Sequence, residues 1–432
     1  MSIMNHHDMV VNAISSMLDE TEPPVTADCC IYKVPFVIRR LNDDAYTPKV
    51  ISIGPFHHRH HHHPRLQNME RHKLIYFKAF LRRTDSTLHI FVHYIESIIP
   101  IFTRSYSETL DFTHQELVKL ILIDSGFIIE LFWRFYYDDW SQDDAFLLKP
   151  WLASHIRLDL LLLENQLPFF ILEKIFNISF TTSNSTHTSA KTKIPSFLDL
   201  TFDYFAYYNK SNLVSDNSDI SIRHFTDLIR IFHLQHPLER RPRRIDEPMK
   251  HLHCVTELLE AGVRFKVNTK SECLLDLRFS GRVLEIPQLK VEDWTEILFR
   301  NMVALEQCHY PYESYITDYV AVLDFLINTG RDVDILVQKG ILVNWLGNSD
   351  SVANLFNSLW KNVTHLNFNS HYSVLCEDLN GFCSDPLHKL KATLRRDYCS
   401  SPWQTAASIA GILLLILSLI QSVCSVLQVV QQ

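Results

Sequence analysis

Apolar residues recur at helical spacing through most of this chain. In residues 68–83, Met69, Leu74, Phe77 and Phe80 fall on one side of a helix, opposite basic residues. The same periodicity predicts further helices over residues 113–135, 151–166, 225–234, 250–261, 315–329 and 350–362, and one that starts at residue 293. The pattern therefore predicts a mainly α, multi-helix globular body.

A small β element is expected within this helical body. Three short runs of β-forming residues, 263–267, 274–279 and 283–286, are separated by turn residues, with Gly281 between the last two. They predict a hairpin or meander. Residues 30–40 are also expected to be extended, and Pro35 suits an edge or docking segment.

The C-terminal segment has a different pattern. No charged residue follows Asp397, and residues 406–427 form an apolar stretch of 22 residues, enough to cross a hydrocarbon core as a helix. Trp403 suits the interface. Four basic residues precede it and indicate the cytosolic side, namely Lys389, Lys391, Arg395 and Arg396. We expect a tail-anchored, single-pass membrane protein, with a buried core helix as the alternative.

These patterns divide the chain into three regions. Residues 1–28 are a polar leader without the basic flank and apolar run of a signal peptide. Residues 29–397 are the helical body, with linker-like loops near 181–193 and 237–248, and residues 403–430 are the anchor. Serine side chains in the anchor could face a second copy of the chain, so a homo-oligomer is one of the alternatives.

Composition favours a compact cytosolic body. Hydrophobic residues make up 47% and aromatic residues 12%, and the net charge of -8 gives no field that attracts nucleic acid. The nine cysteines include no C-x-x-C pair and suit reduced thiols. Sequons stand at Asn177, Asn184, Asn209 and Asn362, which we interpret as chance matches that would become acceptors only in a lumenal body.

Familiar catalytic motifs are missing from the sequence. The closest glycines, Gly340 and Gly347, are seven residues apart, so neither a phosphate-binding loop nor a nucleophile elbow is present. We therefore predict no catalytic residue, no cofactor and no metal ligand, and a protein that is not an enzyme.

Histidines and arginines give the most conspicuous polar runs. The run from His57 to His63 could bind a transition metal, but a flexible polar loop is the favoured interpretation. Isolated histidines and a cysteine lack metal-site spacing, namely His233, His236, His251, His253 and Cys254. The cluster from Arg240 to Arg244 could dock anionic lipid or act as a nuclear signal, and a solvated linker is favoured.

Acidic residues offer two further candidates. Four aspartates flank Trp140 and are expected in a solvated turn, namely Asp138, Asp139, Asp143 and Asp144. Glu164 lies among leucines beside Asn165 and Gln166. Hydrogen bonding at a helix end explains Glu164 more simply than general acid catalysis.

Several segments together resemble a plant family, the "domain of unknown function 247". They are YKVPF at 32–36, YTPKVISIGPFHH at 46–58, MERHK at 69–73, DLLLLENQLPFF at 159–170, ELLEAGVRFK at 257–266 and the stretch 286–307. Phe56 replaces the tyrosine typical of the second segment. The resemblance implies a membrane-anchored, mostly α plant protein without an established catalytic mechanism, and some grass members are similar to determinants of self-incompatibility.

The leading hypothesis is a membrane-tethered module for recognition between proteins, because a large body without a catalytic motif is held at a surface. The alternative is an uncharacterised enzyme with a site between helices that uses Glu164 or His57. A structural adaptor that oligomerises through the anchor is compatible with the first hypothesis.

Overall fold

The computed structural model describes residues 6–19, 27–58, 64–84, 86–140, 144, 149–180, 194–215, 221–385 and 402–430. The described chain is mainly α-helical with a few short strands, as the sequence predicts. It divides into two compact units, Met1–Phe232 with Ile297–Tyr310 and His233–Glu296 with Pro311–Gln432. We call them unit 1 and unit 2.

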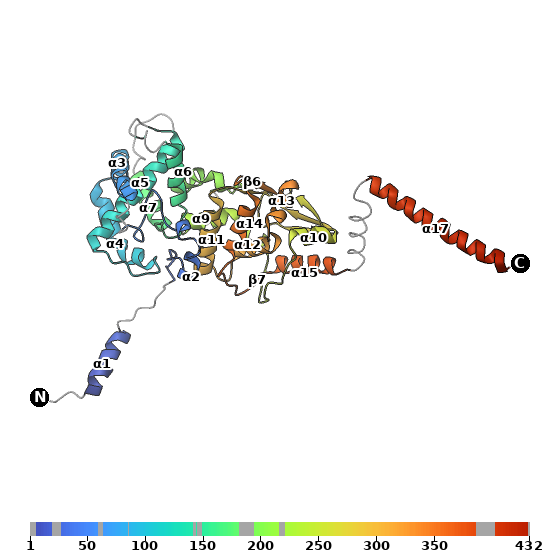
Figure 1. The fold of residues 1–432 in the computed structure, drawn as a ribbon. Coiled ribbons are helices and arrows are strands. Elements are labelled where there is room, and N and C mark those ends of the chain that lie inside the picture. Colours follow the sequence, from blue (N-terminus) through green and yellow to red (C-terminus); the bar gives the residue numbers. More distant parts are fainter. Residues whose placement is uncertain are drawn as a thin grey trace. The chain divides into compact units, whose positions relative to one another are not determined.

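Unit 1 is built around helix α5 (His114–Tyr137). This helix starts at a capping box in which Thr113 and Glu116 each accept a hydrogen bond from the other's backbone N–H group. It packs against α3 (Pro64–Arg83), α4 (Leu88–Arg104), α7 (Phe169–Phe180) and α8 (Phe197–Tyr204), as Figure 1 shows. Its apolar residues point in all directions, so it forms the core of the unit.

A glycine permits the close contact between α5 and α3. A Cβ atom on Gly126 would lie 2.3 Å from the Phe77 ring, so a larger residue would force the helices apart. The remaining elements of the unit are α1 (His6–Asp19), α2 (Phe36–Arg39), η1 (Asp43–Ala45), α6 (Pro150–Asp159), η4 (Ala206–Tyr208) and most of α9 (Phe225–His233) and α11 (Thr295–His309).

The N-terminal segment of the body packs on α11. Val34, Ile38 and Tyr46 are buried with Leu163 and Leu305 in one apolar cluster. This cluster fixes α2 and the chain that follows it against the turn after α6. The contact positions the polar groups described below.

Unit 2 combines helices with three small sheets. Its strands are β1 (Arg244–Ile245), β2 (Arg264–Val267), β3 (Arg278–Ser280), β4 (Val283–Ile286), β5 (Leu289–Val291), β6 (Leu342–Asn344) and β7 (Phe368–Asn369). The sheet orders are β1-β7, β2-β4-β3 and β5-β6. Strands β3 and β4 form the predicted hairpin, with Gly281 at a φ of 64° in its turn. Strand β2 pairs with β4 in parallel, which a meander would not do.

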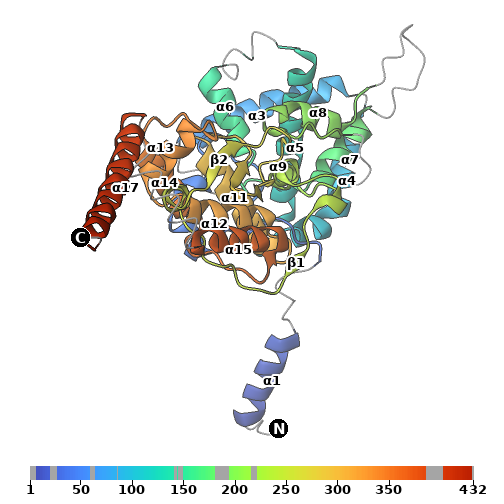
Figure 2. The ribbon, with the colours of Figure 1, turned by 90° about the vertical axis from the view of Figure 1, so that its right-hand side faces the viewer.

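The helices of unit 2 pack beside these sheets. They are η5 (Leu238–Arg240), α10 (Val255–Ala261), α12 (Tyr315–Leu326), α13 (Gly330–Gln338), α14 (Ser349–Leu359), α15 (Ser370–Ser384) and α17 (Pro402–Val430). Helix α14 packs on α12 and α13 (Figure 2). Helix α10 packs on α13 and α15.

The structure corrects several predicted boundaries. Helix α6 ends at Asp159 instead of residue 166, because the following residues turn and are held by side chains described below. Helix α10 begins at Val255, not at residue 250. Pro35 precedes the short helix α2 where an extended segment was expected. The sequence analysis did not predict α1, α4, α7, α8, α13 or α15.

Candidate functional site

A polar cluster of unit 1 surrounds the buried carboxylate of Glu164, in the turn after α6. Lys33 Nζ and His57 Nε2 each lie 3.1 Å from its Oε2. The Val34 N–H group donates to Oε1 at 2.8 Å, and Arg39 Nη1 donates to the same oxygen at 2.6 Å. We call these five residues the Glu164 cluster. It joins the segment around α2, the loop that ends at His57 and the turn after α6.

These donors keep Glu164 ionised. Burial acts to raise the pKa of Glu164, but the hydrogen bond from His57, the charge of Lys33, the Val34 amide and the charge of Arg39 lower it to about 2. Burial lowers the pKa of His57, against the effect of its hydrogen bond to Glu164. At neutral pH the cluster therefore holds a carboxylate, two cations and a neutral imidazole.

The contacts of Glu164 suit a structural role, in which its carboxylate holds the backbone at Val34, better than a role in proton transfer. A carboxylate with a pKa of about 2 is a weak base. Four donors already occupy its two oxygens, which leaves little room for a substrate proton. Glu164 thus has a hydrogen-bonding role, as predicted, but it lies in the turn after α6 and not at a helix end, because α6 already ends at Asp159.

Three further buried side chains bond the extended segment before His57. Asp159 accepts from three consecutive N–H groups, those of residues 49–51. Asn165 accepts from the N–H group of Ile53, and Asp124 accepts from that of Gly54. Burial raises the pKa of Asp159 and of Asp124 to about 6. Side chains here take the place of a neighbouring strand.

The sequence analysis missed the roles of Asp124 and Asp159. A signal was present, since each is a lone acid in a long apolar run, where a charge must find partners. Asn165 was noted only as a neighbour of Glu164. Its Nδ2 group donates to the carbonyls of Ile51 and Asp159, so it bonds both segments.

The structure brings together the two residues that the enzyme hypothesis named, Glu164 and His57. His58 places its ring 6.0 Å from the ring of Phe112, and residues 59–63 of the histidine run lie outside the described residues. Among the residues that the structure describes, no group of three or more histidines, cysteines or acids could hold a metal ion.

The histidines and the cysteine that lack metal-site spacing in the sequence include His251, His253 and Cys254, whose contacts are as follows. His253 pairs with Glu257 at 3.0 Å, and its ring lies 5.9 Å from that of His251. Burial raises the pKa of the Cys254 thiol, which makes it a poor nucleophile.

The aspartates near Trp140 separate into exposed and buried groups. Asp138 and Asp139 are exposed at the end of α5. Asp144, by contrast, is fully buried and pairs with Arg134, so the expected solvated turn is wrong for this residue. Asp143 lies outside the described residues.

The arginine cluster is also divided. Arg240 is exposed, as a solvated linker would be. Arg244 forms an ion pair with the buried Asp318, and its Nε donates to Asn367 Oδ1 at 2.9 Å. The linker prediction is therefore wrong for Arg244, which fastens β1 to α12.

Helix α17 exposes apolar side chains on all its faces. None of the 20 residues Ala406–Ser425 is buried, and Leu414, Leu415 and Leu417 are more than half exposed. The Ser422 hydroxyl donates to the Ser418 carbonyl at 2.9 Å, which satisfies it inside the helix. This helix is long and apolar enough to span a membrane. The predicted basic flank before it lies outside the described residues.

Helix α1 presents a second exposed apolar surface. Val10, Ile14 and Leu18 are 46%, 51% and 69% exposed and lie four residues apart, on one face of the helix. The helix contains neither lysine nor arginine. We call these three side chains the α1 stripe.

Comparison with known proteins gives a consistent match. A family model described as "Plant protein of unknown function", DUF247, matches residues 31–417. The chain is 28% identical to UPF0481 protein At3g47200 of Arabidopsis thaliana, over 92% of this chain and 86% of the relative. It is 23% identical to putative UPF0481 protein At3g02645 of the same plant, over 90% and 89%. No solved structure matches significantly.

Proposed function

This chain belongs to DUF247, a family of plant proteins of unknown function, and we propose that it is a membrane-anchored module that recognises another protein at the cytosolic face. Helix α17 supplies the anchor in this proposal, and α1 supplies part of the recognition surface. The self-incompatibility role that the family resemblance implies would be one form of such recognition.

The exposure of α17 carries the proposal. Each large apolar side chain left in water is unfavourable by about 1.5–3 kcal/mol relative to burial. The 20 residues of Ala406–Ser425 include no charged residue, and none of them is buried in the protein. A hydrocarbon core would accept this helix without any unsatisfied backbone group.

Two observations support a cytosolic body. Four basic residues precede the span, at 389, 391, 395 and 396 in the sequence, as in segments that stay on the cytosolic side. The eight cysteines that the structure describes are free thiols, several of them buried, as in proteins of a reducing compartment.

The α1 stripe supports a protein partner. Amphipathic helices that lie on anionic membranes carry lysine or arginine on their polar face, and α1 has none. A helix with anchors at i, i+4 and i+8 suits a hydrophobic groove on another protein. Attachment through α17 would raise the effective concentration of α1 near such a partner.

An enzyme that uses Glu164 and His57 has weaker support. The two side chains are in contact at 3.1 Å, but the carboxylate is saturated by donors and buried. A structural role for the contacts of Glu164 and His57 is sufficient to explain why the two residues lie together.

Proximity labelling in plant cells tests the proposal. The labelling enzyme is fused to Met1 of the full chain, of a chain that lacks residues 398–432, and of the variant Val10→Asp/Ile14→Asp. We expect membrane-associated neighbours that disappear with the truncation, and a partner that disappears with the α1 variant although the membrane neighbours stay. Asn12→Asp is the control on the same helix. Labelled lumenal proteins, or the same neighbours for all chains, would contradict the proposal.

A further inference from the structure

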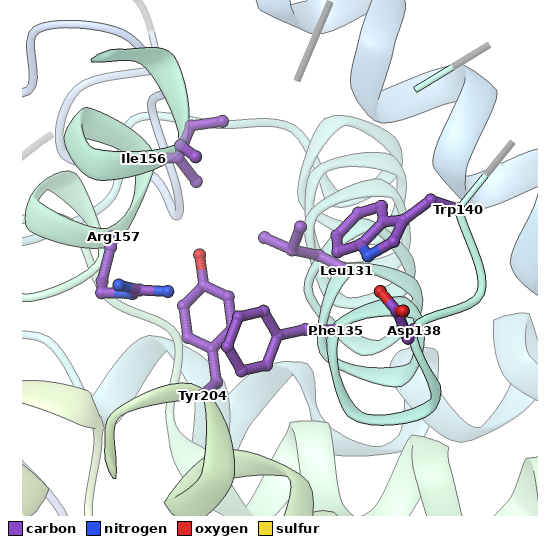
Figure 3. A pocket seen from close by; sticks show the side chains of 8 residues that line it. Leu131, Phe135, Asp138, Trp140, Ile156, Arg157 and Tyr204 are labelled. Carbon is purple, nitrogen blue, oxygen red and sulfur yellow. The ribbon is translucent and has the colours of Figure 1, made fainter. Parts of the chain in front are cut away.

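Unit 1 contains a partly open cavity that the Glu164 cluster does not use. Its volume is about 280 Å³, close to the lower end of small-molecule sites. Leu131 and Phe135 of α5, Ile156 of α6 and the aromatic rings of Trp140 and Tyr204 form its walls. Figure 3 shows these side chains converging on the space between α5, α6 and α8. The walls are mostly apolar, as in sites for small organic ligands.

A cation lines this apolar cavity. The guanidinium carbon of Arg157 lies 5.0 Å from the centre of the Tyr204 ring and 5.5 Å from that of Phe135. Its Nε is buried and has no hydrogen-bond partner. No carboxylate within the described ranges lies at ion-pair distance from Arg157. A buried N–H group without an acceptor is unfavourable, and a bound anion would supply one.

Three buried cations in the described part of unit 1 are paired with acids. Lys73 Nζ lies 2.7 Å from Asp124, and Arg230 Nε lies 2.9 Å from Glu306. Arg134 likewise bonds Glu130, at 2.7 Å. Arg157, which is partly buried, instead lies against two aromatic rings and forms no ion pair with an acid of the described residues.

Tyr204 adds a hydrogen-bonding group to the same wall. Its hydroxyl points into the cavity in Figure 3, beside the Arg157 side chain. Burial raises the pKa of Tyr204 to about 12 against the lowering effect of Arg157, so the hydroxyl stays protonated and can donate. The carboxylate of Asp138 also lines this cavity, but Asp138 is exposed at the end of α5, so water screens its charge.

We propose that this cavity binds a small organic carboxylate with one aromatic or short aliphatic body. The carboxylate accepts from Arg157 and from the Tyr204 hydroxyl, and the body packs between Trp140, Phe135 and Leu131. A planar guanidinium matches a carboxylate through two parallel N–H groups. The volume admits one ring and excludes a peptide segment or a long acyl chain.

Phenylacetate and its neutral analogue phenylacetamide are the probes for this site. Binding is measured by isothermal titration calorimetry on the full chain in detergent micelles. We expect phenylacetate to bind the wild type and phenylacetamide to bind at least about tenfold more weakly, because hydrogen bonds to charged groups are the stronger ones. Arg157→Met keeps the aliphatic stem and is expected to remove this preference.

A second variant keeps the test valid if Arg157→Met is poorly folded. Ala153 lines the cavity, so Ala153→Phe should fill it and abolish binding of both probes. Circular dichroism checks the fold of both variants. Equal affinity of the wild type for the two probes, no binding of phenylacetate, or unchanged binding to Ala153→Phe would overturn the proposal.

Discussion

Helices α5 and α17 are both long and apolar, yet their environments are opposite. Helix α5 is largely buried in unit 1 and still contains Asp124, Glu130 and Arg134. Helix α17 contains no charged residue, and its apolar window is unburied. Hydrophobicity alone does not separate them. A core helix can keep charges because neighbouring elements supply partners, whereas a helix without partners has to do without charges.

Of the substitutions proposed here, two lysines placed in α17 should cause the largest change, a loss of membrane insertion. In Leu414→Lys/Leu417→Lys, each charge at the centre of the span raises the free energy of insertion by about 2.5–3.5 kcal/mol. We expect the chain to leave the membrane fraction, as measured by fractionation of plant cells and immunoblotting. Leu414→Ile/Leu417→Ile is the matched control and should stay in the membrane. A membrane-bound lysine variant would show that α17 is not the anchor.

Removal of a buried charge from α5 should cause the next largest change, a decrease in the free energy of unfolding. Asp124→Asn leaves the fully buried Lys73 with Glu70 as its one remaining acid partner among the described residues. We expect the free energy of unfolding to fall by about 3 kcal/mol. Urea unfolding of the full chain in detergent micelles, followed by circular dichroism, measures it. Asp138→Asn, at the exposed end of the same helix, should change stability by less than about 0.5 kcal/mol. Equal effects of the two substitutions would refute the role of the buried pair.

Glu164→Gln tests, outside α5, whether a buried charge stabilises the protein through partners on neighbouring elements. Its cations, Lys33 and Arg39, are partly exposed, so we expect a smaller loss of about 2 kcal/mol at pH 7. The folded pKa of about 2 lies below the unfolded value of about 4.3. The stabilisation is therefore present above pH 4.3 and is lost as the pH falls toward 2. Urea unfolding at pH 7, 5, 4 and 3 should show the two proteins converging, and a constant difference would contradict this.

A substitution at the N-terminal cap of α5 should cause the smallest decrease in the free energy of unfolding. Thr113→Ala removes a side-chain acceptor for the Glu116 N–H group, which should lower the free energy of unfolding by about 1 kcal/mol. Thr87 occupies the same position in α4 without a side-chain cap bond, so Thr87→Ala is the matched control. We expect less than half the loss for the control. Urea midpoints that shift equally would reject the capping box as a source of stability.

The mainly α class of the fold and several of its helices were predictable because their signals are local, although α1, α4, α7, α8, α13 and α15 were not predicted. Helices α3, α5, α12 and α14 follow the periodicity of their own residues, and the hairpin around Gly281 follows its turn. Helix α6 was predicted too long, because Asn165 and Gln166 bond carbonyls of the turn and compete with the helix. Those bonds depend on tertiary placement, which periodicity does not contain.

The candidate sites were less predictable than the fold. Glu164 and His57 are more than a hundred residues apart, and nothing in their local sequences indicates that they meet. Asp144 and Arg244 appeared to be solvated, and each is instead paired inside the protein. The cavity beside Arg157 combines residues from three helices, so it becomes visible only in the folded structure.

The central claim is that α17 spans a membrane and holds the body on the cytosolic side. Protease protection tests it most directly, on sealed microsomes from plant cells that express the chain with different epitope tags before Met1 and after Gln432. We predict that carbonate does not extract the chain, that protease removes the N-terminal tag, and that the C-terminal tag stays protected until detergent is added. Extraction by carbonate, or protection of the N-terminal tag, would contradict the account.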